Sequence, residues 1–177
     1  MPTTLPVPIE FSLPEGWRAA PPDEVGAPEA AFIALHPHPD AGFTANITVD
    51  GDFLPDGTTL EELADASVVR VRAISETVEV AGRRAIDSPT APGLTQRLTL
   101  SAVVAGIHRD LVQTQVYTTV QDTADPHKRA VIRTVLTATA AQHDSVLGDF
   151  QAFLRTVRPD TDTDTDTDAG TDTGTAG

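Results

Sequence analysis

Hydrophobic and polar residues alternate over much of this chain, with the period of two that is typical of β-strands. Such alternation, or a compact apolar run of strand length, occurs in six segments: residues 9–13, 30–37, 43–49, 94–104, 111–120 and 130–140. The last segment is also rich in β-branched residues, which favour strands. Because long strands joined by short turns pair with their chain neighbours, the pattern predicts an antiparallel sheet.

Turn-forming residues divide the rest of the chain. Residues 77–80 and 83–87 have strand character and flank Ala81-Gly82, which indicates a tight hairpin. Residues 18–28 are rich in proline, acidic and small residues, so we expect a loop there. A further loop is expected at Asp125-Pro126, between two of the alternating segments.

One helix is predicted in the middle of the chain, over residues 59–74. Thr58 or Thr59, followed three residues later by Glu61 or Glu62, forms the pattern of a capping box. Apolar residues then recur at helical spacing and leave the charged residues on the opposite side.

A second helix is predicted near the carboxyl end, over residues 145–157, from apolar residues at the same spacing. Asp144 or Ser145 is its expected cap, and Arg158-Pro159 ends it. The predicted order is β-β-β-α-β-β-β-β-α. This order describes an α+β domain with a mainly antiparallel, six- to seven-stranded sheet and two principal helices packed on it.

The chain length suits one domain, which we place at residues 9–158 after an extension at residues 1–8. Residues 159–177 read PDTDTDTDTDAGTDTGTAG and contain no large apolar residue. Such a segment buries too little surface to offset the cost of ordering, so we expect a disordered, solubilising tail.

Charge and composition exclude several classes of function. The formal net charge is −14 at pH 7, and six of the 26 acidic residues lie in the tail. The remaining acids still outnumber the 12 basic residues, which argues against nucleic acids and anionic membranes as partners. The absence of cysteine removes disulfides, thiolate metal sites and cysteine nucleophiles. Without a signal-peptide pattern or an apolar segment of about 20 residues, we expect a cytoplasmic protein with no membrane insertion.

Several short segments carry a family resemblance when taken in order. They are Leu13-Pro14-Glu15-Gly16-Trp17, Ala30-Ala31-Phe32-Ile33-Ala34, Ala45-Asn46-Ile47-Thr48-Val49, the helix from Leu60, Gln113-Thr114-Gln115-Val116 and Phe150-Gln151-Ala152-Phe153-Leu154. Over residues 9–158 the chain resembles the PsbP-like family, which includes the Ran-binding Mog proteins, and more narrowly the actinobacterial LpqN/LpqT lipoproteins. The resemblance implies an α/β/α sandwich that binds proteins or lipids, or acts as a chaperone, with no catalytic residues. Unlike those lipoproteins, the sequence shows neither the signal nor the lipid-bearing cysteine.

Two motifs in the segment FTANITVDGDF have a structural and a functional interpretation. Asn46-Ile47-Thr48 matches a glycosylation site, but its alternation places Asn46 on the polar face of a strand. Asp50-Gly51-Asp52 lacks the further acids of a calcium loop, so we expect a turn after the strand.

The strongest metal candidate is His36-Pro37-His38-Pro39-Asp40, which offers two imidazoles and a carboxylate in five residues. A further ligand at a fixed spacing is missing, so we predict no bound metal and no cofactor.

His108-Arg109-Asp110-Leu111 imitates the catalytic loop of a kinase, but neither a glycine-rich loop nor Asp-Phe-Gly accompanies it. A serine hydrolase would combine His108 and Asp110 with a serine, and the candidates are Ser67, Ser101 and Ser145. The alternative to a binding protein is therefore a hydrolase or metal-dependent enzyme that uses His36 and His38, or His108.

We interpret the chain as a non-enzymatic binding module for a partner protein or an apolar small molecule, of unknown oligomeric state. The predicted contact residues are polar or aromatic groups on the less apolar strand faces: Trp17, Asn46, Gln113, Gln115 and Tyr117. Trp17 has a second interpretation, as a buried residue that plugs the edge of the sheet.

Overall fold

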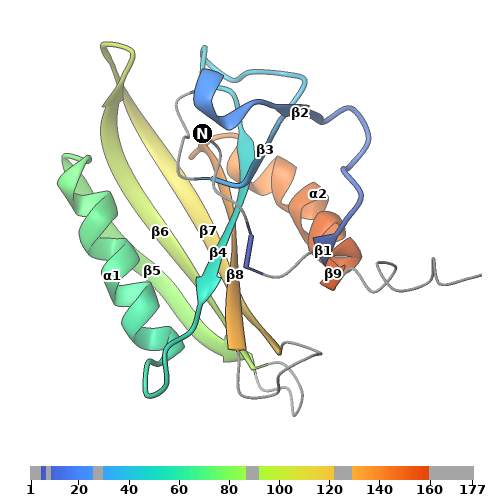
Figure 1. The fold of residues 1–177 in the computed structure, drawn as a ribbon. Helices are drawn as coiled ribbons and strands as arrows, with labels where there is room; N and C mark the ends of the chain where they lie inside the picture. The colour runs from blue at the N-terminus through green and yellow to red at the C-terminus, as the bar shows by residue number, and fades with distance from the viewer. Residues whose placement is uncertain (1–4, 7–8, 26–29, 87–91, 122–128, 160–177) are drawn as a thin grey trace, which may run out of the picture.

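The computed structural model describes residues 5–6, 9–25, 30–86, 92–121 and 129–159. Its main element is a seven-stranded antiparallel sheet with the strand order β2-β3-β4-β8-β7-β6-β5 (Figure 1). The strands of this sheet are β2 (Arg18–Ala20), β3 (Phe32–Leu35), β4 (Asn46–Phe53), β5 (Thr77–Ile86), β6 (Gly93–Val104), β7 (Ile107–Gln121) and β8 (Arg129–Thr139). The helices are α1 (Leu60–Ala73), α2 (His143–Thr156) and the short 3-10 helix η1 (Pro22–Glu24). A separate two-stranded sheet joins β1 (Ile9–Glu10) to β9 (Arg158–Pro159).

The two long helices cover opposite faces of the sheet, as Figure 1 shows. Residues of α2 such as Phe150 pack against β4 and β8, while Val68 of α1 packs against β6 and β7. Successive side chains of a strand point to opposite faces, so each strand contributes apolar residues to the core on both sides of the sheet. Val131 and the next residue, Ile132, for example, belong to different hydrophobic clusters. We call the two surfaces the α1 face and the α2 face. The predicted α/β/α sandwich is thereby confirmed.

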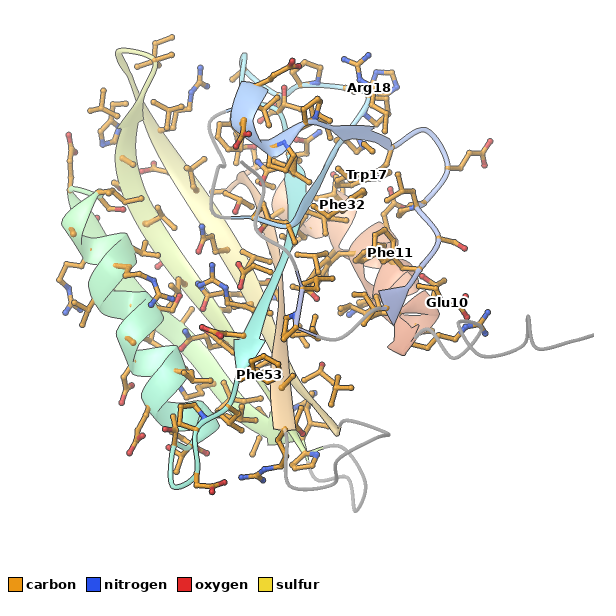
Figure 2. The ribbon with its side chains drawn as sticks, in the orientation of Figure 1. Glu10, Phe11, Trp17, Arg18, Phe32 and Phe53 are labelled. Carbon is orange, nitrogen blue, oxygen red and sulfur yellow. The ribbon has the colours of Figure 1, made fainter. Side chains whose placement is uncertain are left out.

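Aromatic residues fill the α2 face beside the amino-terminal segment. The ring of Phe11 makes edge contacts with Phe32 and Phe153, at centroid distances of 4.7 and 5.2 Å. Trp17 is only 6 % exposed, and its Nε1 donates a hydrogen bond to Asp149 Oδ2 at 3.0 Å. Figure 2 shows the two rings Phe11 and Phe32 and the indole of Trp17 between the sheet and α2. Burial of these rings attaches the amino-terminal segment to the domain.

The first predicted helix is confirmed with its cap. Thr59 Oγ1 accepts a hydrogen bond from the backbone N–H of Glu62, and the Glu62 carboxylate accepts one from the N–H of Thr59. The predicted carboxyl-terminal helix is also present, but its cap was predicted wrongly. Gln142 occupies the N-cap position without a side-chain cap, and Ser145 Oγ instead donates to the carbonyl of Gln142 at 2.7 Å.

The order of elements is β-β-β-β-α-β-β-β-β-α, followed by the short β9. One strand more than predicted precedes α1, because the predicted loop begins with β2. Ala19 of β2 pairs with Ala34 of β3, and two of the three β2 residues are exposed. Backbone pairing forms this strand without an apolar pattern, so no local pattern predicts it. The predicted loop at Asp125-Pro126 lies outside the described residues, as does the predicted tail from residue 160 onward. The first residue of that predicted tail, Pro159, is instead part of β9 and pairs with Ile9.

The predicted hairpin at Ala81-Gly82 is wrong. β5 runs through these residues as one strand, and both halves pair with β6, Val80 with Leu98 and Gly82 with Arg97. Ala81 is the extra residue of a β-bulge, so turn-forming residues here bend a strand instead of reversing it.

The predicted turn at Asp50-Gly51-Asp52 is also wrong, because β4 continues to Phe53. Asp50 pairs with Arg133, and Gly51 pairs with Ile132. A Cβ atom at Gly51 would lie 2.9 Å from both the Val131 carbonyl oxygen and the Ile132 side chain. The glycine therefore permits close packing within the sheet.

No helix in the described part of the chain is long and apolar enough to cross a membrane.

Candidate functional site

Polar side chains form rows across the α1 face, where β4, β8 and β7 lie side by side. Strand pairing places Asn46 and Gln113 on either side of Thr137. Four residues further along each strand, Asp50 and Tyr117 flank Arg133 in the same way. Because side chains on one face recur every two residues, these groups from distant segments share a surface that α1 only partly covers.

The centre of this surface is an ion pair. Arg133 donates to Oδ2 of Asp50 from Nη2 at 2.9 Å and from Nε at 3.2 Å, and its Nη1 donates to Ser67 Oγ of α1 at 3.1 Å. The side chains of Arg133 and Asp50 are 23 % and 24 % exposed. Burial lowers the pKa of Arg133, but the negative charge of Asp50 and the neighbouring Tyr117 raise the pKa by more, so Arg133 stays charged.

A buried hydrogen-bond network lies beside the ion pair under α1. The Nε2 of Gln96 donates to Gln115 Oε1 at 2.7 Å and to the carbonyl of Ala64 at 3.1 Å. The Tyr117 hydroxyl also donates to Gln115 Oε1, at 3.1 Å. Gln96, Gln115 and Tyr117 are each 2 % exposed or less. These bonds satisfy polar groups that would otherwise be costly to bury, and they join α1 to β6 and β7.

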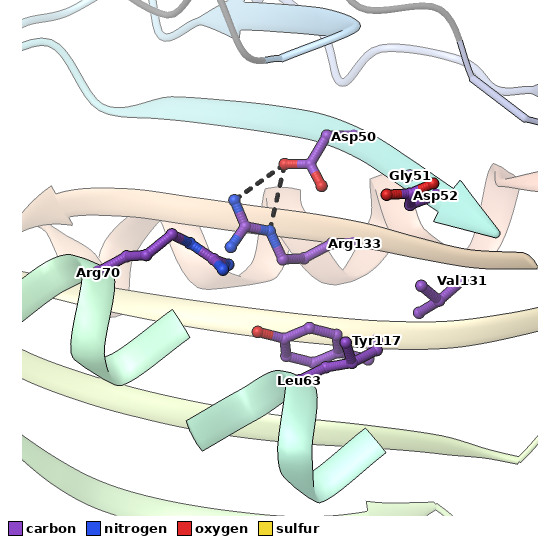
Figure 3. Close-up of a pocket in the computed structure, with 8 residues that line it drawn as sticks. All are labelled: Asp50, Gly51, Asp52, Leu63, Arg70, Tyr117, Val131 and Arg133. Atoms are coloured by element: carbon purple, nitrogen blue, oxygen red, sulfur yellow. Dashed lines mark hydrogen bonds and ion pairs between the residues drawn. The ribbon is translucent and has the colours of Figure 1, made fainter. Parts of the chain in front are cut away.

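A pocket of about 350 Å³ opens between α1 and β4, next to the ion pair (Figure 3). It is lined by Asp50, Gly51, Asp52, Leu63, Arg70, Tyr117, Val131 and Arg133. Leu63, Val131 and the ring of Tyr117 supply apolar surface, while the charged groups come from α1, β4 and β8. We call this the α1–β4 pocket.

Arg70 differs from the other charged groups of the α1–β4 pocket. Its side chain is exposed, and it has no hydrogen-bond or ion-pair partner among the described residues. In Figure 3 the guanidinium of Arg70 extends from α1 toward Arg133, which is already paired with Asp50. An unpaired guanidinium above an apolar surface is suited to a carboxylate, since its planar donors match two oxygens.

The structure brings together four of the five predicted contact residues. Asn46, Gln113, Gln115 and Tyr117 lie on the α1 face, and Tyr117 lines the α1–β4 pocket. Asn46 is half-buried, with its Nδ2 donating to the Thr44 carbonyl at 3.2 Å. Trp17 lies apart from them, buried on the α2 face, which agrees with its structural interpretation.

The described residues contain no cluster of three or more histidine, cysteine, aspartate or glutamate side chains that could hold a metal. His36 Nδ1 accepts from the backbone N–H of His38 at 3.1 Å, and the His36 ring contacts Trp17 edge-on at 5.1 Å. Asp40 accepts a hydrogen bond from Thr139 Oγ1 at 2.6 Å. The rings of His36 and His38 contact each other at a centroid distance of 5.8 Å, whereas the third candidate ligand, Asp40, is bonded elsewhere, to Thr139.

His108 and the candidate serines are also separated. His108 Nε2 lies 3.1 Å from Glu76 on an exposed part of the surface. Ser101 Oγ donates to Asp110 Oδ1 at 2.7 Å, Ser67 accepts from Arg133, and Ser145 donates to a backbone carbonyl. Within the described ranges, no serine is hydrogen-bonded to His108.

Apart from Tyr117, the sequence analysis does not identify the residues that line the α1–β4 pocket. The helical pattern places Arg70 on the solvent side, and the Asp-Gly-Asp motif predicts a turn at Asp50. Arg133 pairs with Asp50 across 83 positions of sequence, so no local pattern could connect them. The one available signal was charge on an otherwise apolar strand, at Arg133 in residues 130–140.

Comparison with known proteins gives the class of fold. No protein-family model matches the chain, and no curated protein matches it. Solved structures match it over most of its length and show that it has the Mog1p/PsbP-like fold, as the family resemblance implied.

Three of these structures come from different organisms. LpqN of Mycobacterium tuberculosis, described as involved in cell envelope biogenesis, is 14 % identical, with a TM-score of 0.57 over 87 % of this chain and 86 % of LpqN. Cyanobacterial PsbP (CyanoP) of Synechocystis sp. PCC 6803 is 15 % identical, with a TM-score of 0.54 over 86 % of each chain. The Ran-binding protein Mog1p of Saccharomyces cerevisiae is 14 % identical, with a TM-score of 0.51 over 85 % of this chain and 89 % of Mog1p.

Proposed function

We propose that this chain is a non-enzymatic binding module that holds a segment of a partner protein in the α1–β4 pocket. The observation that carries the proposal is the unpaired guanidinium of Arg70 beside an apolar surface formed by Leu63, Val131 and Tyr117. A peptide that carries an acidic side chain next to an apolar one would satisfy both features.

The bonding of the other polar groups supports binding over catalysis. Asp50 is neutralised by Arg133 and so is poorly suited to act as a base. The Tyr117 hydroxyl is committed to Gln115 as a donor. Mog1p, which shares the fold, is a Ran-binding protein, and this gives a precedent for protein binding by the same architecture.

The proposal is tested by selecting peptides from a phage-displayed library on the immobilised full-length chain. Enriched peptides should carry an acidic residue near an apolar one. Charge-assisted hydrogen bonds contribute about 1.5–3 kcal/mol, so Arg70→Gln should weaken the binding of an enriched peptide roughly 10- to 100-fold. Arg72→Gln is the matched control, because Arg72 is exposed on the same helix but does not line the pocket.

Equal peptide affinity of the Arg70→Gln and unmodified chains would contradict the proposal. The alternative ligand, an apolar small molecule, is tested on the same preparation by native mass spectrometry and solvent extraction. A stoichiometric lipid recovered from the purified chain, and displaced by no selected peptide, would favour that alternative.

A further inference from the structure

The β5 strand forms one border of the main sheet. It pairs with β6 on its inner side, and no described strand pairs with its outer side. Nine of its ten residues are exposed, and only Val78 is half-buried. A strand in this position presents a row of backbone N–H and C=O groups to which another chain can add.

Exposed apolar side chains gather along this border. Val80 and Ile86 of β5 are 45 % and 40 % exposed. Val69 of α1 is 63 % exposed and lies on the same side of the helix as Asp65, four residues earlier. Asp65 accepts a hydrogen bond from Arg83 of β5 at 2.8 Å, so this side of α1 adjoins the strand. Covering these three side chains would remove apolar surface from water.

The bulge at Ala81 decides which β5 side chains share a face. In a regular strand Glu79 and Arg84 would point to opposite faces, because they are five residues apart. With one extra residue between them, Glu79 pairs with Thr99 and Arg84 pairs with Thr95, two β6 residues on the same face. Both charges are exposed and without a partner among the described residues.

We propose that β5 is a homodimer interface, in which two copies pair antiparallel about a two-fold axis with Glu79 opposite Arg84 of the second copy. This pairing also places Thr77 opposite Ile86 and Val78 opposite Ala85. In each pair the two side chains lie on the same face of the joined sheet. This is because the extra residue in the bulge shifts the alternation of side chains after Ala81 by one position relative to the side chains before it. The two-fold axis forms the Glu79–Arg84 ion pair twice.

The charges of β5 favour a second copy as the occupant of this border. Glu79 precedes the bulge and Arg84 follows it, so the strand is complementary to its own reversed sequence. Opposite charges across neighbouring strands stabilise pairing, whereas like charges oppose it. The overall net charge of −14 opposes association, so the interface is measured at about 0.15 M salt, where the Debye length is about 8 Å.

The test is the mass of the full-length chain in solution, measured by sedimentation equilibrium over a range of concentrations. The unmodified chain should form a dimer. Glu79→Arg alone and Arg84→Glu alone each place two like-charged pairs in the interface, and each should raise the dimer Kd roughly 10- to 100-fold. An equimolar mixture of the two variants should dimerise again, since every opposed pair then carries opposite charges.

The mixture carries the same total charge as the unmodified dimer, so rescue on mixing cannot come from a change in net charge. Glu15→Arg, an exposed site near the amino terminus outside β5, changes the net charge as Glu79→Arg does and should leave the dimer intact. Circular dichroism confirms that each variant is folded. A chain that stays monomeric at about 1 mM, or a dimer that neither charge reversal weakens, would overturn the proposal. The bulge and the arginines would then protect the edge against pairing.

Discussion

Replacement of Asp50 by asparagine tests how much the partly buried ion pair with Arg133 contributes to stability. The carboxylate accepts two hydrogen bonds from Arg133, at 2.9 and 3.2 Å, and both side chains are about a quarter exposed. Exposed ion pairs contribute roughly 0–1 kcal/mol, whereas removing one partner of a fully buried pair costs about 3–5 kcal/mol. Because the Asp50–Arg133 pair is partly exposed, the cost of breaking it should lie between these limits. The amide oxygen of the introduced asparagine can also still accept a hydrogen bond from Arg133. We therefore expect Asp50→Asn to lower the free energy of unfolding by about 2 kcal/mol.

The assay is urea unfolding followed by the fluorescence of Trp17, the only tryptophan of the chain, which is 6 % exposed in the folded state. Asp52→Asn is the matched control, because Asp52 lies on the same face of β4, is exposed, and among the described residues bonds only to the N–H of Phe53. A surface substitution of this kind changes stability by less than about 0.5 kcal/mol.

The reasoning is refuted if Asp50→Asn costs no more than Asp52→Asn. A second variant separates the charge effect from a packing effect. Arg133→Met in the Asp50→Asn background removes the uncompensated guanidinium, so it should recover part of the lost stability.

Four further variants test stability in other parts of the molecule. Burial lowers the pKa of His143, against the opposing effect of Asp144, so the folded state binds the proton less readily than the unfolded state. The unfolding free energy should therefore fall as pH decreases below about 6.5, the ordinary pKa of histidine, and His143→Gln should flatten that part of the pH profile in urea titrations. Thr59→Ala removes the α1 cap and should cost about 1 kcal/mol by the same titrations, and an unchanged midpoint would contradict the role of the cap. Gly148→Ala should stabilise α2 by about 0.5–1 kcal/mol, because a Cβ there has no neighbour within 4 Å. Gly93→Ala should destabilise the protein, because its Cβ would lie 2.8 Å from the Tyr117 carbonyl oxygen, and thermal unfolding compares the two glycine variants.

Periodicity predicted the long strands and the helices, because each of them buries one side against a core. The segments that form β6, β7 and β8 alternate over ten residues or more. The tertiary packing of these strands agrees with the period of two in their sequence, so the pattern predicted them correctly. The errors fall where local residue preference and long-range pairing disagree. Gly82 and Gly51 favour turns, but partners on β6 and β8 hold both residues in strands.

The candidate site was less accessible to sequence reasoning. Alternation correctly placed Gln115 and Tyr117 on a shared strand face, because that inference needs only the period of two. The alternation could not show that both side chains are hydrogen-bonded within a buried network. That network depends on Gln96 from the neighbouring strand and on α1 above it. Arg70 becomes notable only once its lack of a partner is known.

The pairing of β1 with β9 determines how the domain would respond to mechanical load. Ile9 lies opposite Pro159 and Glu10 lies opposite Arg158, so the first residue of β1 is paired with the last residue of β9. Tension applied between handles at the two ends would first load the packing of Leu5 against the core on the α2 face. It would then open the β1–β9 pairs one after another, beginning with Ile9 and Pro159. The next tension-bearing contact on the amino-terminal side would be the packing of Phe11 against Phe32 and Phe153. Pulling should therefore give a small early extension at low force, followed by rupture of the sandwich as a whole.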